Sequence, residues 1–529
     1  MMKHGLQIAM EPGNRQENTF AEIENLLNIG IALSAEKDLN RLLEMIVTEA
    51  RRITNADAGT LYLKQQDVLY FRISQNQTLK IRQGGDGELL NLPPVPIKKE
   101  NVSGYVALTG CSVNISDVYQ TEAFDFTGPR HYDQMTGYRT RSMLVVPIKN
   151  QEGDILGVLQ LINAQDPANQ EVISFAPYYQ KVIESLASQA GVAITNTQLL
   201  RDIEELFNSF VKVMAAAIDS RTPYNANHSR RVALLARAIG ERINQEEEEP
   251  WREIVFTQER LDQLTMAGWL HDIGKIATPL SVMNKATRLG DGLELLLQRF
   301  DYIWRTEETI SLQRQLELWQ TGQEKQAREE VFQLQERRRQ LEAHREIILR
   351  VNDPGTLVDE VIANQLREIA SKTYLDPAGQ PKPYLTAVEL NNLIVRTGTL
   401  TSEERQIMEE HVAITARLLE NIPFIKKFQE VPVFARMHHE HLDGKGYPQG
   451  IKGDKIPLEA RILALVDVFD ALTASDRPYK KALPVDQALR IMGFMVKDGK
   501  LDERVYNLFV KYQIWESDTI NNLNNLNNR

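Results

Sequence analysis

Two hydrophobic periods follow one another in the first third of the chain. From about Thr19 to Ala58, apolar residues recur at the three-to-four-residue spacing of an amphipathic helix. Later segments either alternate apolar and polar positions or form apolar runs bounded by turn residues, as strands do. Strands are predicted at 59–64, 68–74, 142–150 and 155–164. A Gln-Glu-Gly-Asp turn joins the last two, which predicts a β-hairpin in an α+β domain over 19–175.

A single long helix is predicted after this domain, from about Tyr178 to Ala217. Its apolar side is spaced for a seam between two parallel helices. The predicted seam residues are Val182, Leu186, Gln189, Val192, Ile194, Leu199, Ile203 and Leu206. We therefore expect a helical linker over 176–218 through which two copies of the chain form a homodimer, with a simple buried helix as the alternative.

A further domain is expected over 219–515. With 529 residues, 42% of them hydrophobic and 25% charged, the chain is typical of a globular protein of two or three domains. No apolar run is long enough to cross a membrane, and the N-terminus lacks the apolar core of a secretory signal. We expect disordered ends at 1–18 and 516–529.

Charge and cysteine content narrow the class of protein further. The formal net charge of −11 argues against binding to a nucleic acid polymer, which needs a basic face. The one cysteine, Cys111, excludes an internal disulfide framework and a cysteine-based metal cluster. We expect a cytoplasmic protein with Cys111 in the core of the α+β domain.

Candidate ligands for metal ions gather in the second half of the chain. The sequence HHEHLDGKGYP at 438–448 places two adjacent histidines before a tight, glycine-containing turn. Neighbouring side chains on a helix diverge, so two adjacent imidazoles converge only at a helix end or on a large target such as a pair of ions. Further candidates in the same half are His228, His271, Asp272, His411 and Asp467.

Three blocks of sequence together resemble one family. HDIGK at 271–275, HHEHLDGKGYP at 438–448 and ILALVDVFDALTASDRPYKKA at 462–482 are similar to the HD-GYP branch of the HD phosphohydrolases. That family hydrolyses cyclic di-GMP. The resemblance covers about 219–515 and implies an all-α domain there. The resemblance implies a metal-dependent phosphodiesterase that produces pGpG and/or GMP. It leaves open a signalling adaptor that recruits partners, and a hydrolase of another cyclic nucleotide.

The resemblance also implies a binuclear centre of two divalent metal ions. Such a pair activates water and offsets the charge that builds up on the phosphoryl oxygens. Mixed imidazole and carboxylate ligands suit iron or manganese. The implied ligands are His228, His271, Asp272 and Asp467 in a first group, and His411, His438 and His439 in a second. Asp272 is expected to contact both ions, and Tyr224 replaces a glutamate that holds a third ion in some relatives.

Other residues of these blocks are implied to act around the ions. Lys275 is expected to be catalytic and to contact the substrate phosphates together with Arg477 and Lys480. The residues expected to orient the ligands and shape the turn are Glu440, Asp443, Gly444, Gly446, Tyr447 and Pro448. His441 is not a ligand in the family, and we expect it to be exposed.

The chain departs from the family pattern by a long insertion. KATRL at 285–289 begins a turn that LTSEERQIMEEH at 400–411 completes. The residues between them, about 289–398, keep helical spacing and are rich in Leu, Gln, Arg and Glu. We expect an inserted helical hairpin that docks a partner protein and contributes nothing to the chemistry. His344 within it is expected to be exposed.

The N-terminal domain resembles a GAF sensor domain. The resemblance rests on TGYRTRSMLVVPI at 136–148 and on the hairpin that follows. GAF domains bind cyclic nucleotides, other small molecules or nothing, and all three remain open here. Asn163 is followed by alanine, and Phe175 lacks an acidic pair after it, which departs from the cyclic-nucleotide pattern. The GAF domain is expected to regulate the phosphodiesterase.

Overall fold

The computed structural model describes residue 24 and residues 27–85, 92–221, 227–474 and 482–516. The chain divides into two compact units, with the boundary between Phe207 and Asn208. The two terminal segments predicted to be disordered lie almost wholly outside the described residues, as does Tyr224. None of the described helices is long and apolar enough to span a membrane.

The first unit is built on an antiparallel sheet with the order β3-β2-β1-β7-β6-β5. Two short strands extend it, with β4 paired to β2 and β8 paired to β7. The strands are β1 Ala56–Gln65, β2 Val68–Asn76, β3 Ile81–Gly84, β4 Val95–Pro96, β5 Val113–Ile115, β6 Met143–Lys149, β7 Ile155–Gln165 and β8 Val172–Ile173. The predicted hairpin is confirmed as β6 and β7, which pair from Met143↔Ile162 to Lys149↔Ile155.

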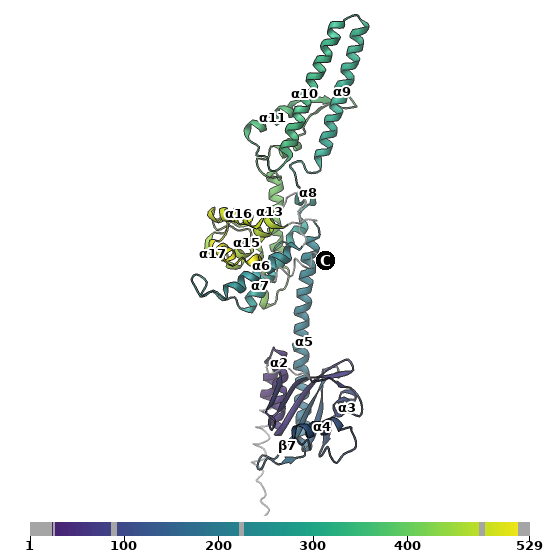
Figure 1. The fold of residues 1–529 in the computed structure, drawn as a ribbon, viewed down its shortest axis with the longest axis vertical. Helices are drawn as coiled ribbons and strands as arrows, with labels where there is room; N and C mark the ends of the chain where they lie inside the picture. The colour runs from purple at the N-terminus through teal and green to yellow at the C-terminus, as the bar shows by residue number, and fades with distance from the viewer. Residues whose placement is uncertain (1–23, 25–26, 86–91, 222–226, 475–481, 517–529) are drawn as a thin grey trace, which may run out of the picture. The chain divides into compact units, whose positions relative to one another are not determined.

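Helices cover both faces of this sheet: α2 (Leu39–Thr54), α3 (Val102–Thr109), α4 (Thr127–Thr136) and the first half of α5 (Pro177–Asp219). Leu61 and Leu63 of β1 point to the core shared with α2 and α5, whereas Tyr62 between them points to the core shared with α3. Figure 1 shows α2 and α3 on opposite sides of the sheet. The α+β fold class is therefore confirmed.

Three expectations for this unit are wrong. Residues 27–35 and α2 are separate helices, because Asp38 starts α2 by accepting a hydrogen bond from the Arg41 N–H (3.0 Å). The helix also ends at Thr54 rather than continuing to Ala58. Cys111 is exposed, because it lies in the turn between α3 and β5.

The predicted seam on α5 is wrong at two positions. Leu186 and Ile194 are fully buried in the core between α5 and the sheet, so they are not available to a second helix. The reason is that the first half of α5 covers the sheet, so the apolar side chains of this half pack into that core.

The second unit is helical, as predicted. It contains α6 His228–Ile243, α7 Gln258–Leu270, η1 Ile273–Ala277, α8 Leu280–Met283, α9 Gly292–Gln320, α10 Glu324–Asn352, α11 Glu360–Ser371, α12 Ala387–Leu393, α13 Ser402–Glu420, η2 Lys426–Phe428, α14 Val431–Arg436, η3 Gly453–Lys455, α15 Leu458–Thr473, α16 Val485–Lys497, α17 Glu503–Lys511 and η4 Ile514–Glu516. It also contains a two-stranded ribbon that was not predicted, formed by β9 (Thr373–Leu375) and β10 (Pro381–Pro383).

The insertion has a hydrophobic core of its own. The long helices α9 and α10 pack side by side as a hairpin, and α11 and α12 close its base (Figure 1). At that base the fully buried Arg288 donates hydrogen bonds to four backbone carbonyls, including Val395 (2.9 Å) and Thr356 (2.7 Å). His344 is half-buried rather than exposed, since its side chain lies at the base between α10 and Lys372.

Candidate metal centre

The seven predicted ligands come from distant parts of the second unit and lie together in the structure. Five are at or near helix ends: His228 is the first residue of α6, His271 and Asp272 follow α7, and His438 and His439 follow α14. His411 lies in the middle of α13 and Asp467 in α15. The position after α14 lets the two adjacent imidazoles converge, because the chain is no longer helical there.

His228, His271 and Asp272 form a first group whose candidate ligand atoms lie within 4.8 Å of one another. Asp272 Oδ2 lies 3.4 Å from His228 Nε2 and 3.3 Å from His271 Nε2. Asp467 Oδ1 completes this group, at 3.3 Å from His228 Nε2 and 3.8 Å from His271 Nε2. The group therefore offers two imidazoles and two carboxylates around one point.

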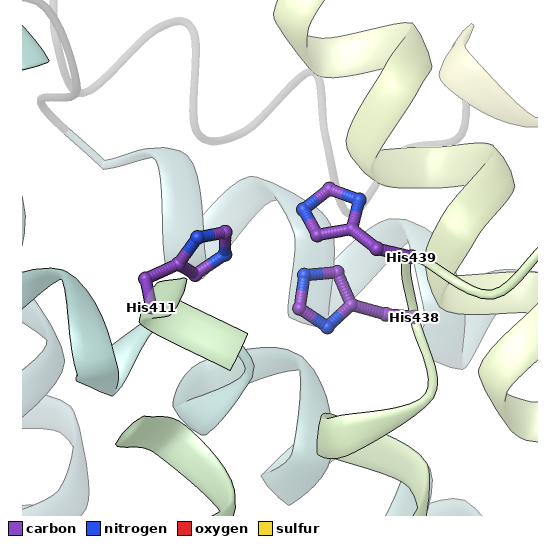
Figure 2. Close-up of side chains that lie close together, drawn as sticks. All are labelled: His411, His438 and His439. Carbon is purple, nitrogen blue, oxygen red and sulfur yellow. The ribbon is translucent and has the colours of Figure 1, made fainter. Parts of the chain in front are cut away.

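His411, His438 and His439 form a second group, whose candidate ligand atoms also lie within 4.8 Å of one another. In Figure 2 the His411 ring faces the other two across a small space. The other oxygen of Asp272, Oδ1, lies 3.2 Å from His411 Nε2. Asp272 thus presents one oxygen to each group, which is the arrangement that a carboxylate bridging two cations requires.

Backbone carbonyls fix the tautomer of three of these histidines. The Nδ1 atoms of His271, His411 and His438 lie 2.8, 2.5 and 2.6 Å from the carbonyl oxygen three residues earlier. A carbonyl oxygen can only accept, so each Nδ1 carries the hydrogen and each Nε2 presents a lone pair to the centre. This arrangement is typical of imidazoles that bind a metal ion through Nε2.

Several polar atoms at the centre lack a hydrogen-bond partner among the described residues. They are the buried Nε2 atoms of His228, His271, His411 and His438, and Oδ1 of Asp272. Leaving a buried polar atom unsatisfied costs about 1–3 kcal/mol. Five such atoms converging on one region are unfavourable without a cation, so the residues present fit a pair of divalent metal ions.

The charge states of the side chains agree with this fit. Burial lowers the pKa of His439 to about 3, which keeps it neutral as a ligand must be. Burial opposes ionisation of Asp467, but contacts with His228 and His271 hold its pKa well below the usual value. Burial likewise opposes protonation of His271, yet the charge of Asp272 raises its pKa to about 9, so a cation bound at the centre would replace the proton on Nε2. The carboxylates thus attract positive charge to the place that a metal ion would occupy.

Two residues that the sequence analysis missed hold His228 in place. Asp470 Oδ2 accepts a hydrogen bond from His228 Nδ1 at 2.8 Å. Arg231 donates to both oxygens of Asp470, at 2.5 and 2.9 Å. The signal in the sequence is the spacing of Asp467 and Asp470, which puts both carboxylates on one side of α15.

Residues of the turn at 440–448 shape the second group. Glu440 accepts hydrogen bonds from the N–H groups of Gln449 and Ile451, each at 2.8 Å. The Tyr447 ring lies 4.7 Å from the His439 ring, centroid to centroid. Gly446 packs so closely that a Cβ there would lie 2.5 Å from the His439 carbonyl oxygen. The turn therefore supports the side and backbone of His439.

The remaining predicted residues differ in position. Lys275 Nζ lies 2.5 Å from Asp272 Oδ2, so it is within reach of the centre. Asp443 accepts a hydrogen bond from the Lys445 N–H (2.9 Å), and Gly444 has a φ of 81°, as a tight turn requires. His441 is half-buried rather than exposed, because it lies inside the same turn. Pro448 follows Tyr447 on the exposed side of the turn, and Arg477 and Lys480 lie outside the described residues.

Comparison with known proteins defines the class of the chain. Residues 38–194 match the GAF domain model, 225–355 match an HD domain model, and 386–505 match a second HD domain model. The first HD match contains His228, His271 and Asp272, the second contains the other four predicted ligands, and the structure brings the two sets together in one centre. The chain therefore carries a GAF domain followed by a helical region that matches HD domain models.

Its relatives include proteins that are named as phosphodiesterases. One stretch of 102 residues is 41% identical to the 3'3'-cGAMP-specific phosphodiesterase 3 of Vibrio cholerae, covering 19% of this chain and 21% of that protein. Over 100 residues the chain is 44% identical to the cyclic di-GMP phosphodiesterase response regulator RpfG of Xanthomonas campestris pv. campestris, covering 19% of this chain and 26% of that protein. The cyclic di-GMP phosphodiesterase of Thermotoga maritima is 37% identical over 126 residues, covering 23% and 33%.

These matches span between about a fifth and a third of the relatives' length. Among solved structures, the GAF domain of the Acinetobacter phosphoenolpyruvate-protein phosphotransferase aligns with 34% of this chain and 98% of that chain. Its sequence identity is 16% and its TM-score is 0.26.

Proposed function

We propose that the chain is a metal-dependent phosphodiesterase that hydrolyses cyclic di-GMP to pGpG and/or GMP. The observation that carries this proposal is Asp272, whose two oxygens face two separate groups of buried imidazoles. Two divalent ions, iron or manganese, would be held by the seven ligands. When bound, such a pair lowers the pKa of a water molecule and offsets the negative charge of the reacting phosphate.

The chain's own residues would position the substrate around that pair. Lys275 keeps a positive charge beside Asp272, where it can contact a phosphate oxygen. Arg477 and Lys480 are proposed to bind the substrate phosphates from the segment that follows α15. Asp470 and Arg231 hold His228, and Glu440 holds the turn that supports His439. Each of these roles keeps a ligand or a phosphate in one orientation.

The test is hydrolysis by the purified chain loaded with manganese or ferrous iron. The substrates are cyclic di-GMP, 3'3'-cGAMP and cyclic di-AMP, and the products are separated by chromatography. We expect the highest kcat/KM for cyclic di-GMP. A chain that holds two ions and hydrolyses none of the three would overturn the proposal and favour the signalling adaptor.

Preference for 3'3'-cGAMP is the second candidate, because two of the similar Vibrio cholerae proteins are named as specific for it. The ratio of kcat/KM for the two substrates decides between the candidates. A ratio that favours 3'3'-cGAMP would replace the substrate and leave the reaction unchanged.

A cavity of about 400 Å³ in the GAF domain supports regulation by a small molecule. The rings of Tyr62, Phe71 and Phe126 line it together with hydroxyl and amide side chains. Its described lining contains Asp125 but neither lysine nor arginine, so no side-chain cation there would meet a phosphate. The proposed ligand is therefore aromatic and carries no phosphate. Tight binding of cyclic GMP or cyclic AMP in calorimetry would contradict this.

The second half of α5 supports a homodimer. Five large apolar side chains at alternating spacings of four and three residues are more than half exposed: Leu199, Ile203, Leu206, Phe210 and Val213. This is the spacing of a parallel two-helix seam. Leu206→Glu should therefore give a monomer in light scattering, whereas Leu108→Glu, at an exposed position on α3, should not.

The inserted hairpin remains a proposed docking surface for a partner protein. Leu312, Leu316 and Trp319 lie along one side of α9 and are each about half exposed. Their spacing places them in one apolar stripe. A pull-down in which Leu316→Glu captures the same proteins as the parent chain would argue against it.

A further inference from the structure

The helix that carries His228 lacks a cap of its own. His228 is the first residue of α6, and the preceding Asn227 has a φ of 63° and makes no side-chain capping bond. Backbone N–H groups in the first turn of a helix have no partner within the helix. Without a cap this turn frays, and a ligand at its first position would lose its orientation.

Asp219, the last residue of α5, supplies the missing cap. Its Oδ2 accepts a hydrogen bond from the Ser229 N–H (3.1 Å), and its Oδ1 accepts one from the Ser229 hydroxyl (2.9 Å). Both residues are buried. A carboxylate at this position satisfies a first-turn N–H and interacts favourably with the positive end of the helix dipole.

Arg221, two residues further on, holds the element that follows Asp272. Its guanidinium donates to the carbonyl of Lys275 (2.7 Å), to that of Ile276 and to that of Thr278 (3.4 Å). These carbonyls belong to η1 and to the residue after it, and η1 begins immediately after Asp272. The end of α5 therefore contacts both elements that carry the first ligand group.

We infer that Asp219 and Arg221 are positioning residues that tie the C-terminal end of α5 to His228 and Asp272. Asp219 orders the first turn of α6, and Arg221 orders η1. A shift of α5 along its axis would then change both sides of the first group together. This inference rests on the proposed function only for the identity of the ions. It extends that function by identifying the residues through which α5 contacts the elements that carry the first ligand group.

The test compares Asp219→Ala with Asp219→Asn in the full chain. We expect Asp219→Ala to bind one of the two ions about 3- to 30-fold more weakly, the effect of losing a helix cap. Amides at the start of α6 should also exchange hydrogen faster. Asparagine caps as well as aspartate does, so Asp219→Asn should restore both values to within about twofold. Asp202→Ala, at an exposed position on α5, is the matched control.

Arg221→Lys provides an independent variant if Asp219→Ala does not fold. Lysine keeps the charge but cannot span three carbonyls, so we expect faster exchange at 273–278 and weaker binding of the same ion. Unchanged ion affinity and exchange in the folded variants would overturn the inference, even if thermal stability fell. A parent chain that binds no metal would overturn the proposed function instead, and hydrogen exchange would still test the cap.

Discussion

Replacing Asp470 tests whether a residue outside the ligand set fixes the orientation of His228 in the first ligand group. Asp470 is buried and joins His228 Nδ1 at 2.8 Å to the Arg231 guanidinium. Burial opposes its ionisation, but His228 and Arg231 lower its pKa, so it is a carboxylate at neutral pH. In this state it keeps the hydrogen on Nδ1 and leaves Nε2 of His228 facing the centre.

Asp470→Ala removes this support without touching a proposed ligand. Loss of such a partner typically lowers metal affinity or activity 10- to 100-fold. Because a tenfold change corresponds to about 1.4 kcal/mol, the expected cost is about 1.4–2.7 kcal/mol. Asp470→Asn should lose less metal affinity, because its amide oxygen can still accept the hydrogen bond from His228 Nδ1. The effect should fall on one ion, since the second group has no contact with Asp470 among the hydrogen bonds of the described residues.

The assay is a titration of the metal-loaded chain with a competing chelator, followed by elemental analysis. The parent should release two ions in separate steps, with only one step shifted in Asp470→Ala. Asp498→Ala is the control, because Asp498 is an exposed partner of Lys500. Equal weakening of both ions would indicate general unfolding, and unchanged affinity for both would refute the role of Asp470.

Three further predictions follow from the same contacts. Asp272→Ala should remove both ions and abolish turnover, since Asp272 faces both groups; retention of two ions in elemental analysis would contradict this. Deleting 289–398 and rejoining the turn should leave metal content and basal hydrolysis intact, because that segment has its own core; a folded deletion variant without metal would argue against it. Asp502→Ala should lower the free energy of unfolding by about 3–5 kcal/mol in a denaturant titration, because it removes both the buried ion pair with Arg461 at 3.0 Å and the N-cap of α17. Burial opposes the ionisation of Asp502, but Arg504 and Arg461 lower its pKa below 3.8, so its contribution is present above that value and disappears as the pH falls through the folded pKa. Acid should therefore destabilise Asp502→Ala less than the parent below about pH 4, and identical acid sensitivity would be the contrary result.

Local patterns in the sequence were sufficient for the elements and for the candidate ligands. The β6–β7 hairpin follows from two apolar runs and a turn between them, and its pairing involves neighbours in the chain. The ligand residues lie in short blocks that contain metal-binding side chains, such as His271 and Asp272. A hairpin depends on interactions within a few residues, so periodicity and spacing reveal it, whereas the ligand set was implied by the resemblance of these blocks to a family.

Only the tertiary structure decided the roles of residues of the same type that lie on the same helix. On α15, Asp467 faces the imidazole Nε2 atoms and Asp470 accepts from Nδ1 of His228, although the two aspartates lie on the same side of the helix. On α5, Leu186 covers the sheet while Leu206 is exposed, because the helix leaves the sheet between them. The cap that Asp219 provides to α6 joins residues ten positions apart in the chain. In each case the role is set by the neighbour that packs against the side chain, and a helical or alternating pattern contains no information about that neighbour.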